Sequence, residues 1–345
     1  MPSYPATAFV VGMIMSNFWK SAKRWLPGVV ISLVAIIFII YKFDLRSLVK
    51  AIRSANYWIL LLCLGISVVW LAVRALAWRT LLRGKASYRD VFLTLSEGYL
   101  LNNFLPFRLG ELGRAFLLGR KANLGFMEVL STIIIERTLD VAFSAAILLS
   151  AVPFVVGAAG AGKIAALMGV LVLAGLLTLF VLARNREWAM HRFERLSARW
   201  PAFKARGRGF ISSFLTGLEG LTNGGLFIRV LFWMIIDWAI AILQFYLLLV
   251  AFFPHPQPVW ALFGLGAAAF GNAVPSLPGG IGTYDAALAG ALTIVSGDPT
   301  TSLAATLVAH IFNYIITGII GAYALATEGE TLMGVYHQLR HQQNK

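Results

Sequence analysis

Acidic residues and cysteine are both scarce in this chain of 345 residues. Only 15 Asp and Glu accompany 29 Lys and Arg, and charged residues make up 13% of the sequence. The single cysteine, Cys63, excludes an intrachain disulfide. With 59% hydrophobic residues and a mean hydropathy of +0.78, the chain is too apolar for an ordinary soluble domain. The composition therefore indicates an integral membrane protein.

The signature motifs of membrane enzymes are absent from the sequence. It has no H-E-x-x-H, G-x-S-x-G or P-loop pattern, no D-x-D pair, and no Cys/His cluster with metal-ligand spacing. We therefore expect no cofactor and no metal, and the sequence names no catalytic nucleophile. The net charge of +14 would suit nucleic acid, but basic residues accumulate on the cytoplasmic loops of multispanning proteins. We expect no nucleic-acid partner.

Hydropathy predicts spanning helices and two pairs of shorter helices. The predicted spans are residues 26–43, 57–82, 126–155, 163–184, 226–252 and 301–326. The shorter pairs are 91–106 with 112–122 and 259–275 with 283–296. The expected fold class is an all-α polytopic membrane protein with about six spanning helices plus two re-entrant helical hairpins in an inverted-topology repeat (8 helices by hydropathy counting).

Basic residues orient these predicted helices. They place an N-terminal tail, residues 1–25, and an amphipathic linker, residues 185–225, in the cytoplasm. The tail precedes a single transmembrane domain at 26–330, and the linker lies inside this domain. A C-terminal tail at 331–345 follows the domain and is also expected in the cytoplasm. We expect the protein to lie in the plasma (inner) membrane. A basic segment between Lys42 and Arg53 falls on the predicted outer side and is an exception to the rule.

One eleven-residue pattern occurs twice. Asn103-x-x-Pro106-x-x-x-Gly110-x-x-Gly113 recurs 169 positions later as Asn272-x-x-Pro275-x-x-x-Gly279-x-x-Gly282. The same offset maps the span 57–82 onto 226–251, and the topology gives the two halves opposite orientations. We therefore predict an inverted-topology repeat with halves at about 57–155 and 226–326. Lipid does not tolerate exposed backbone, so a helix break at depth must be buried in protein or line a cavity. Two breaks at corresponding places in the two halves point to a transport site rather than an anchor.

Charged residues inside apolar runs are the first candidates for a substrate site, because burying charge in lipid is costly. Glu136, Arg137 and Asp140 lie in one predicted span. Glu136 and Asp140 share a helix face, while Arg137 and Asp140 are three residues apart and can pair. One of these acids could also carry a proton during transport. The alternative is a packing cluster that is neutral within itself.

The first hairpin tip places Arg108, Glu111 and Arg114 beside opened backbone. Free N–H groups and arginine forks suit a phosphate, which points to a phospholipid headgroup. Alternatively, Arg108 and Arg114 only mark the cytoplasmic rim. The second tip has no cation; it offers Asn272 and Asp285, and Asp285 either caps the helix that follows or faces a ligand.

Two lone polar residues remain inside predicted spans. We expect Asp237 to contact Arg137 or Arg114 across the bundle, whereas a single histidine such as His310 is more often a core residue than a ligand. The predicted headgroup cavity then comprises Asn103, Arg108, Glu111, Arg114, Glu136, Arg137, Asp140, Asp237, Asn272 and Asp285, with the backbone of Pro106, Gly110, Gly113, Pro275, Pro278, Gly279, Gly280 and Gly282 at the two tips.

The segments "LPFRLGELGRAFLLGR", "IIIERTLD" and "SLPGGIGTYD" resemble the flippase-like family known as the lysylphosphatidylglycerol synthase transmembrane region. The resemblance covers roughly residues 25–330. It implies translocation of a phospholipid or another lipid with an anionic headgroup between leaflets, for which aminoacylated phosphatidylglycerol is one candidate. Only a short tail follows residue 326, so we expect no aminoacyl-transferring domain, and a separate lipid-synthesising enzyme would be a partner.

Two other function classes stay open from the sequence. One is a membrane-embedded lipid-linked glycosyltransferase or phosphotransferase that uses the same acidic cluster. The other is an accessory subunit that binds lipid for such an enzyme. The first would leave a chemically modified lipid, and the second would retain lipid without moving it between leaflets. The prediction favoured here is a lipid transporter rather than an enzyme.

Overall fold

The computed structural model of the chain describes residues 45–105, 109–157, 184–196, 223–274 and 277–328, with scattered positions from 160 to 181. Helices are the only regular elements in this described part, which confirms the all-α prediction. They are α2 (Leu45–Arg53), α3 (Tyr57–Leu81), α4 (Tyr88–Phe104), α5 (Leu109–Lys121), α6 (Phe126–Val155), α8 (Arg186–Leu196), α10 (Gly224–Phe252), α11 (Pro258–Ala273), the 3₁₀ turn η3 (Pro278–Gly280), α12 (Thr283–Ser296) and α13 (Pro299–Thr327).

Four of these helices, α3, α6, α10 and α13, are long and apolar enough to cross a membrane. Their ends agree with the predicted spans to within two residues. The predicted span 26–43 lies outside the described residues, and most of 163–184 does as well. The short helices α4 and α5 form one packed pair, and α11 and α12 form the other. Both predicted pairs are therefore present.

The breaks within the two packed pairs of short helices fall at the repeated pattern. The chain leaves α4 after Phe104 and re-enters helix at Leu109; between them Pro106, Phe107 and Arg108 lie outside the described residues. The second break runs from Val274 to Gly282, where Pro275 and Ser276 are likewise outside. Proline lacks a backbone N–H and disfavours helix in the residue before it, so the helices end there.

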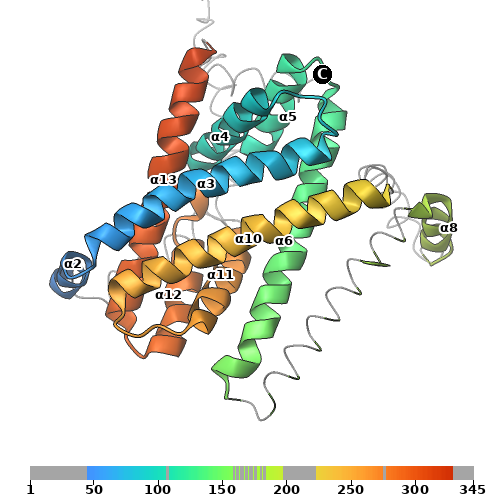
Figure 1. Cartoon of the computed structure of the whole chain (residues 1–345). Coiled ribbons are helices and arrows are strands. Elements are labelled where there is room, and N and C mark those ends of the chain that lie inside the picture. The colour runs from blue at the N-terminus through green and yellow to red at the C-terminus, as the bar shows by residue number, and fades with distance from the viewer. Residues whose placement is uncertain are drawn as a thin grey trace, which may run out of the picture.

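The helix contacts of the first half recur in the second half. Helix α4 packs on α5 and α5 on α6, as α11 packs on α12 and α12 on α13. Between halves, α4 packs on α13 and α11 packs on α6 (Figure 1). Every one of these contacts maps onto its counterpart through the offset of 169 residues. This is the contact pattern that a two-fold repeat requires.

The counterparts α3 and α10 pack against each other and run in opposite directions (Figure 1). The backbone N–H of Asn56, at the start of α3, donates to Ala251 O near the end of α10 over 2.9 Å. Further along, Gln244 donates to the hydroxyl of Ser67 over 2.6 Å. Each helix begins after an asparagine cap, Asn56 or Asn223, whose side chain accepts from the first free backbone N–H groups.

Helix α2 accounts for the basic residues that fell on the predicted outer side. Its Leu48 is buried against α12 and α13, whereas Arg46, Lys50 and Arg53 are exposed. An amphipathic helix with basic residues on its outer face suits a membrane surface. Three of the basic residues of this segment therefore lie on the exposed face of one short helix, while Lys42 lies outside the described residues.

Glycines allow the closest helix contacts. A side chain at Gly110 of α5 would overlap the carbonyl oxygen of Gly98 in α4. Between halves, a side chain at Gly321 of α13 would lie 2.6 Å from Ser96 O of α4, and one at Gly266 of α11 would lie 2.7 Å from Leu148 Cβ of α6. Small residues at such crossings let backbones approach in membrane proteins, so these glycines fix the spacing of the hairpins.

Replacement of Gly110 by alanine is expected to destabilise the protein. The new methyl group would meet backbone in α4, which cannot move aside as a flexible side chain can, and overpacking of this kind costs about 1–3 kcal/mol. The matched control is Gly290→Ala in α12, where nothing lies within 4 Å. There the exchange should leave the melting temperature in detergent unchanged or raise it. Equal melting temperatures for the two variants would contradict the close α4–α5 contact.

Candidate functional site

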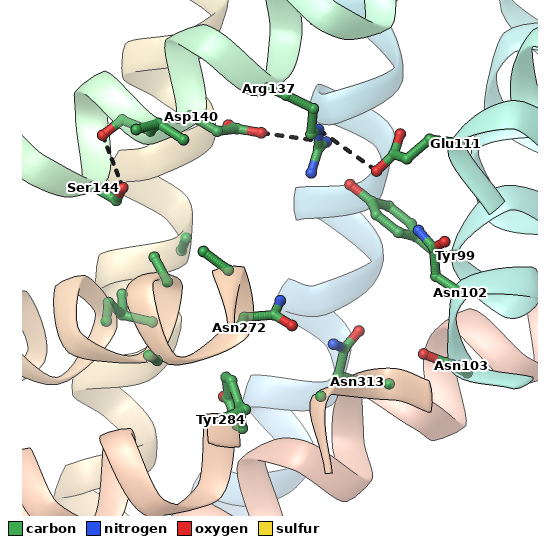
Figure 2. A pocket seen from close by; sticks show the side chains of 18 of the residues that line it. Tyr99, Asn102, Asn103, Glu111, Arg137, Asp140, Ser144, Asn272, Tyr284 and Asn313 are labelled. Carbon is green, nitrogen blue, oxygen red and sulfur yellow. Dashed lines mark hydrogen bonds and ion pairs between the residues drawn. The ribbon is translucent and has the colours of Figure 1, made fainter. Parts of the chain in front are cut away.

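A cavity of about 600 Å³ lies between the two helix breaks. Its volume is in the range of roughly 300–1,000 Å³ that is typical of small-molecule sites. Both halves contribute to its wall, as Figure 2 shows for side chains from α4, α5, α6, α11, α12 and α13. The polar lining residues are Arg74, Tyr99, Asn102, Asn103, Glu111, Arg137, Asp140, Ser144, Asp237, Asn272, Tyr284 and Asn313.

Arg74 of α3 is the centre of a buried ion-pair cluster beside this cavity. Its Nη1 donates to Asp140 Oδ1 of α6 and to Asp237 Oδ2 of α10, each over 2.8 Å. Its Nη2 donates to Glu136 Oε1 over 2.8 Å and also to Asp140. Only 3% of Arg74 is exposed. One guanidinium therefore connects α3 to the carboxylates of two other long helices, α6 and α10.

Arg137 and Glu111 form the accessible side of the cluster. Arg137 donates to Glu136 over 2.6 Å and lies 3.2 Å from Asp140 and 3.7 Å from Glu111 (Figure 2). Its side chain is 29% exposed, against 4% for that of Arg74 and 0% for that of Arg114. Arg137 is thus the arginine of this cluster that a ligand in the cavity can reach most readily.

Arg114 lies behind the cavity wall. It donates to Glu136 Oε2 over 2.8 Å, and its guanidinium lies over the ring of Trp78, 4.0 Å from the ring centre. Neither Arg114 nor Glu136 lines the cavity. The sequence-based hypothesis placed both at the headgroup. The structure places both behind the residues that line the cavity, where Arg114 forms an ion pair with Glu136 and Glu136 forms another with Arg137.

The cluster carries one more negative than positive formal charge. Within the described residues it contains three arginines and four carboxylates: Arg74, Arg114, Arg137, Glu111, Glu136, Asp140 and Asp237. In the same part of the chain, Asp237 Oδ1 and Trp238 Nε1 are buried with no hydrogen-bond partner. Both residues line the cavity. Unpartnered buried polar atoms are rare in folded proteins and call for an explanation, such as a ligand.

Two asparagine side chains at the end of α4 form hydrogen bonds across the first break and to the second half. Asn102 Oδ1 accepts from the backbone N–H of Gly110 over 2.8 Å. Asn103 Nδ2 donates to Thr317 Oγ1 of α13 over 2.9 Å. Gly110 and Gly113 are buried within helix α5, so at this break the glycines of the pattern serve helix packing rather than an open backbone.

The second break is a true glycine turn. Gly279, Gly280 and Gly282 have φ angles of 71°, 78° and 91°, which other residues adopt only with strain. Asp285 Oδ2 accepts from the backbone N–H of Gly282 over 3.0 Å, so the capping role considered for Asp285 is present. Its other carboxylate oxygen, Oδ1, contacts His310 Nδ1 at 2.7 Å. Asp285 itself does not line the cavity.

The structure brings Asn103, Glu111, Arg137, Asp140, Asp237 and Asn272 together in the cavity wall, along with the turn Pro278–Gly280. Arg108 lies outside the described residues. The contact expected between Asp237 and Arg137 or Arg114 is instead made with Arg74, which the sequence analysis did not single out. A signal for it existed. Arg74 is a charged residue in the interior of the apolar span 57–82, and charge inside an apolar span is the criterion that identified Asp237.

Replacement of Arg74 by alanine should unfold or strongly destabilise the protein, because it leaves the buried Glu136 and Asp237 and the partly buried Asp140 without their common partner. Removal of one partner from a buried pair costs about 3–5 kcal/mol. The control is Lys85→Ala, at a pair with Glu128 whose side chains are 51% and 44% exposed. Exposed pairs contribute about 0–1 kcal/mol. Thermal unfolding in detergent measures both, and a small loss for Arg74→Ala would contradict the central role of the cluster.

Comparison with known proteins places the chain in a family. No curated protein matches the chain. Residues 25–321 match the family described as the lysylphosphatidylglycerol synthase TM region. The match includes both helix breaks, the ion-pair cluster and the cavity between them. The chain is therefore a member of the lysylphosphatidylglycerol synthase TM region family.

Proposed function

We propose that the protein moves a phospholipid between the two leaflets of its membrane. The observation that carries this proposal is the cavity between the two helix breaks, with charged and amide groups from both halves in its wall. The headgroup would occupy this cavity while the acyl chains stay in lipid. Membership of a family named for a lipid enzyme's membrane region supports a lipid as substrate.

We also propose that the two short helix pairs are re-entrant. Their helices contain 13 to 17 residues, or about 20–26 Å at 1.5 Å per residue, which is shorter than the roughly 30 Å hydrocarbon core. A pair of this length enters and leaves on one side. With opposite orientations of the halves, the pairs enter from opposite sides and meet at the cavity. Rocking of the halves would then expose the cavity to each side in turn.

The charges favour a headgroup that carries both a phosphate and an ammonium group. Arg137 can donate to a phosphate. The unpartnered Oδ1 of Asp237 and the nearby rings of Trp70 and Tyr99, stacked 6.0 Å apart, suit an ammonium. A purely anionic headgroup would add negative charge to a cluster that already has an excess of it. This refines the anionic headgroup expected from the sequence, and an aminoacylated phosphatidylglycerol meets the refined requirement.

Apolar residues at the rim offer a route for the acyl chains. Val141 of α6 and Val274 at the end of α11 both line the cavity, and they are 58% and 42% exposed. The cavity therefore reaches an apolar outer surface between these helices, which pack on each other. A lipid could place its headgroup in the polar interior and keep its tails outside.

Transport should depend on Arg137. In proteoliposomes, labelled lipids of several headgroup classes would be followed between leaflets for the wild type, Arg137→Ala and the control Arg89→Ala, whose side chain is exposed at the start of α4. Loss of a charge-assisted phosphate contact of about 1.5–3 kcal/mol predicts a roughly 10- to 100-fold slower rate for Arg137→Ala alone. Absence of leaflet exchange by the wild type for every lipid would overturn the proposal, and a modified lipid in the mass spectrum would indicate an enzyme.

A bulky side chain inside the cavity should block transport without removal of any charge. Ala269 lines the cavity, and a tryptophan there would take the space of a headgroup. Ala286 of α12 is exposed and provides the matched control. We expect Ala269→Trp to abolish leaflet exchange while the protein stays monodisperse in detergent, and Ala286→Trp to transport like the wild type. Normal exchange by Ala269→Trp would show that the headgroup passes elsewhere.

A further inference from the structure

His310 faces a hydrogen-bond acceptor at each ring nitrogen. Its Nδ1 lies 2.7 Å from Asp285 Oδ1, and its Nε2 lies 3.0 Å from the backbone oxygen of Gly279. The histidine is 7% exposed and Asp285 is 5% exposed. A peptide oxygen only accepts hydrogen bonds, and an ionised carboxylate does the same. Both ring nitrogens can donate only when the imidazole carries two protons.

The surroundings favour a charged pair over a neutral one. Asp285 already accepts from the backbone N–H of Gly282 at the start of α12, where the helix dipole stabilises a negative charge. Tyr284 of α12 and Tyr314 of α13 lie beside the imidazole, with ring centres at 4.7 Å and 5.0 Å. Helix α4 packs against η3 and α13, and its Asn103 donates a hydrogen bond to Thr317 of α13. Among the described residues, Asp285 is the one charged group that contacts His310.

We infer that His310 and Asp285 form a proton-binding site that controls the glycine turn of the second hairpin. With the proton bound, the imidazolium donates to Asp285 and to Gly279 O together. Release of one proton leaves a neutral ring with a single N–H. That ring can donate to the carboxylate or to the peptide oxygen, and the contact with Asp285 is the stronger of the two. Gly279 O then loses its partner.

Loss of that hydrogen bond acts directly on the cavity wall, because Pro278, Gly279 and Gly280 line the cavity. Other hydrogen bonds also hold the turn: the backbone N–H of Gly280 donates to Leu277 O over 3.0 Å, and Thr283 Oγ1 donates to Gly280 O over 3.4 Å. Tyr314 donates to Pro278 O over 3.3 Å, and the three positive-φ glycines impose little stiffness. Proton binding and headgroup binding therefore involve the same turn. By linkage, each changes the affinity for the other by the same factor.

This location differs from the acids first considered for proton transfer. Glu136 and Asp140 each contact two or more arginines of the ion-pair cluster, so a proton would have to displace an existing partner. His310 and Asp285 have no arginine or lysine contact among the described residues. The part of the inference that couples proton binding to lipid movement rests on the proposed function. The protonation state itself does not, and it can be measured alone.

The direct test is ¹⁵N NMR of the full chain with labelled histidine in lipid nanodiscs. The chain has five histidines, and the signal of His310 is assigned by its loss in His310→Gln. If that variant does not fold, replacement of each of the other histidines in turn assigns it by elimination. At pH 7.5 we expect both ring nitrogens of His310 to carry protons, because both face hydrogen-bond acceptors. His255 is exposed between α10 and α11 and serves as the control position. A singly protonated His310 overturns the inference.

Coupling is tested in the proteoliposome assay with an imposed pH gradient. We expect the gradient to change the wild-type rate and that of His255→Gln, and to leave the rate of His310→Gln unchanged. A doubly protonated His310 in a protein that moves no lipid would refute the proposed function and keep the proton site. Lipid exchange that ignores the gradient in the wild type would refute coupling while the proposed function stands.

Discussion

The arrangement of the long helices depends on the need to pair every buried charge around Arg74. Its guanidinium meets carboxylates from α6 and α10, so three helices distant in sequence must converge at one point. A buried charge without a partner costs more than most single packing contacts provide. The cluster therefore restricts how α3, α6 and α10 can cross. It also places a row of charged groups at one side of the space between the two breaks, which becomes the polar wall of the cavity.

Much of the fold follows from local pattern. Apolar runs predicted α3, α6, α10 and α13 closely, and the repeated motif located both breaks, because hydropathy and proline act within a few residues. Pairing across the bundle is not local. Arg74 and Asp237 are 163 residues apart, and nothing in either segment names the other. Helix α2 was missed since nine residues with three basic side chains fall below any hydropathy threshold.

The sequence predicted most residues of the candidate site, but it could not predict which of them line the cavity and which lie behind its wall. The same criterion of charge inside an apolar run selected Glu136, Arg137 and Asp140 alike. Their exposure differs because Glu136 turns toward Arg74 and Arg114, whereas Arg137 turns toward the cavity. The exposure of each side chain depends on which helix packs on its face of α6. One motif likewise gave two different glycine roles, since Gly110 lies inside a helix and Gly279 lies in a turn.

This difference between the two breaks has a consequence for the resting state of the molecule. In an inverted repeat with identical halves, the conformations open to either side of a symmetric bilayer would be related by a two-fold rotation and equal in free energy. Here one tip is a helix pair locked by Asn102, and the other is a glycine turn held by His310 and Tyr314. In the proposed rocking mechanism this removes the degeneracy, so one access state would be populated in preference to the other even without any gradient.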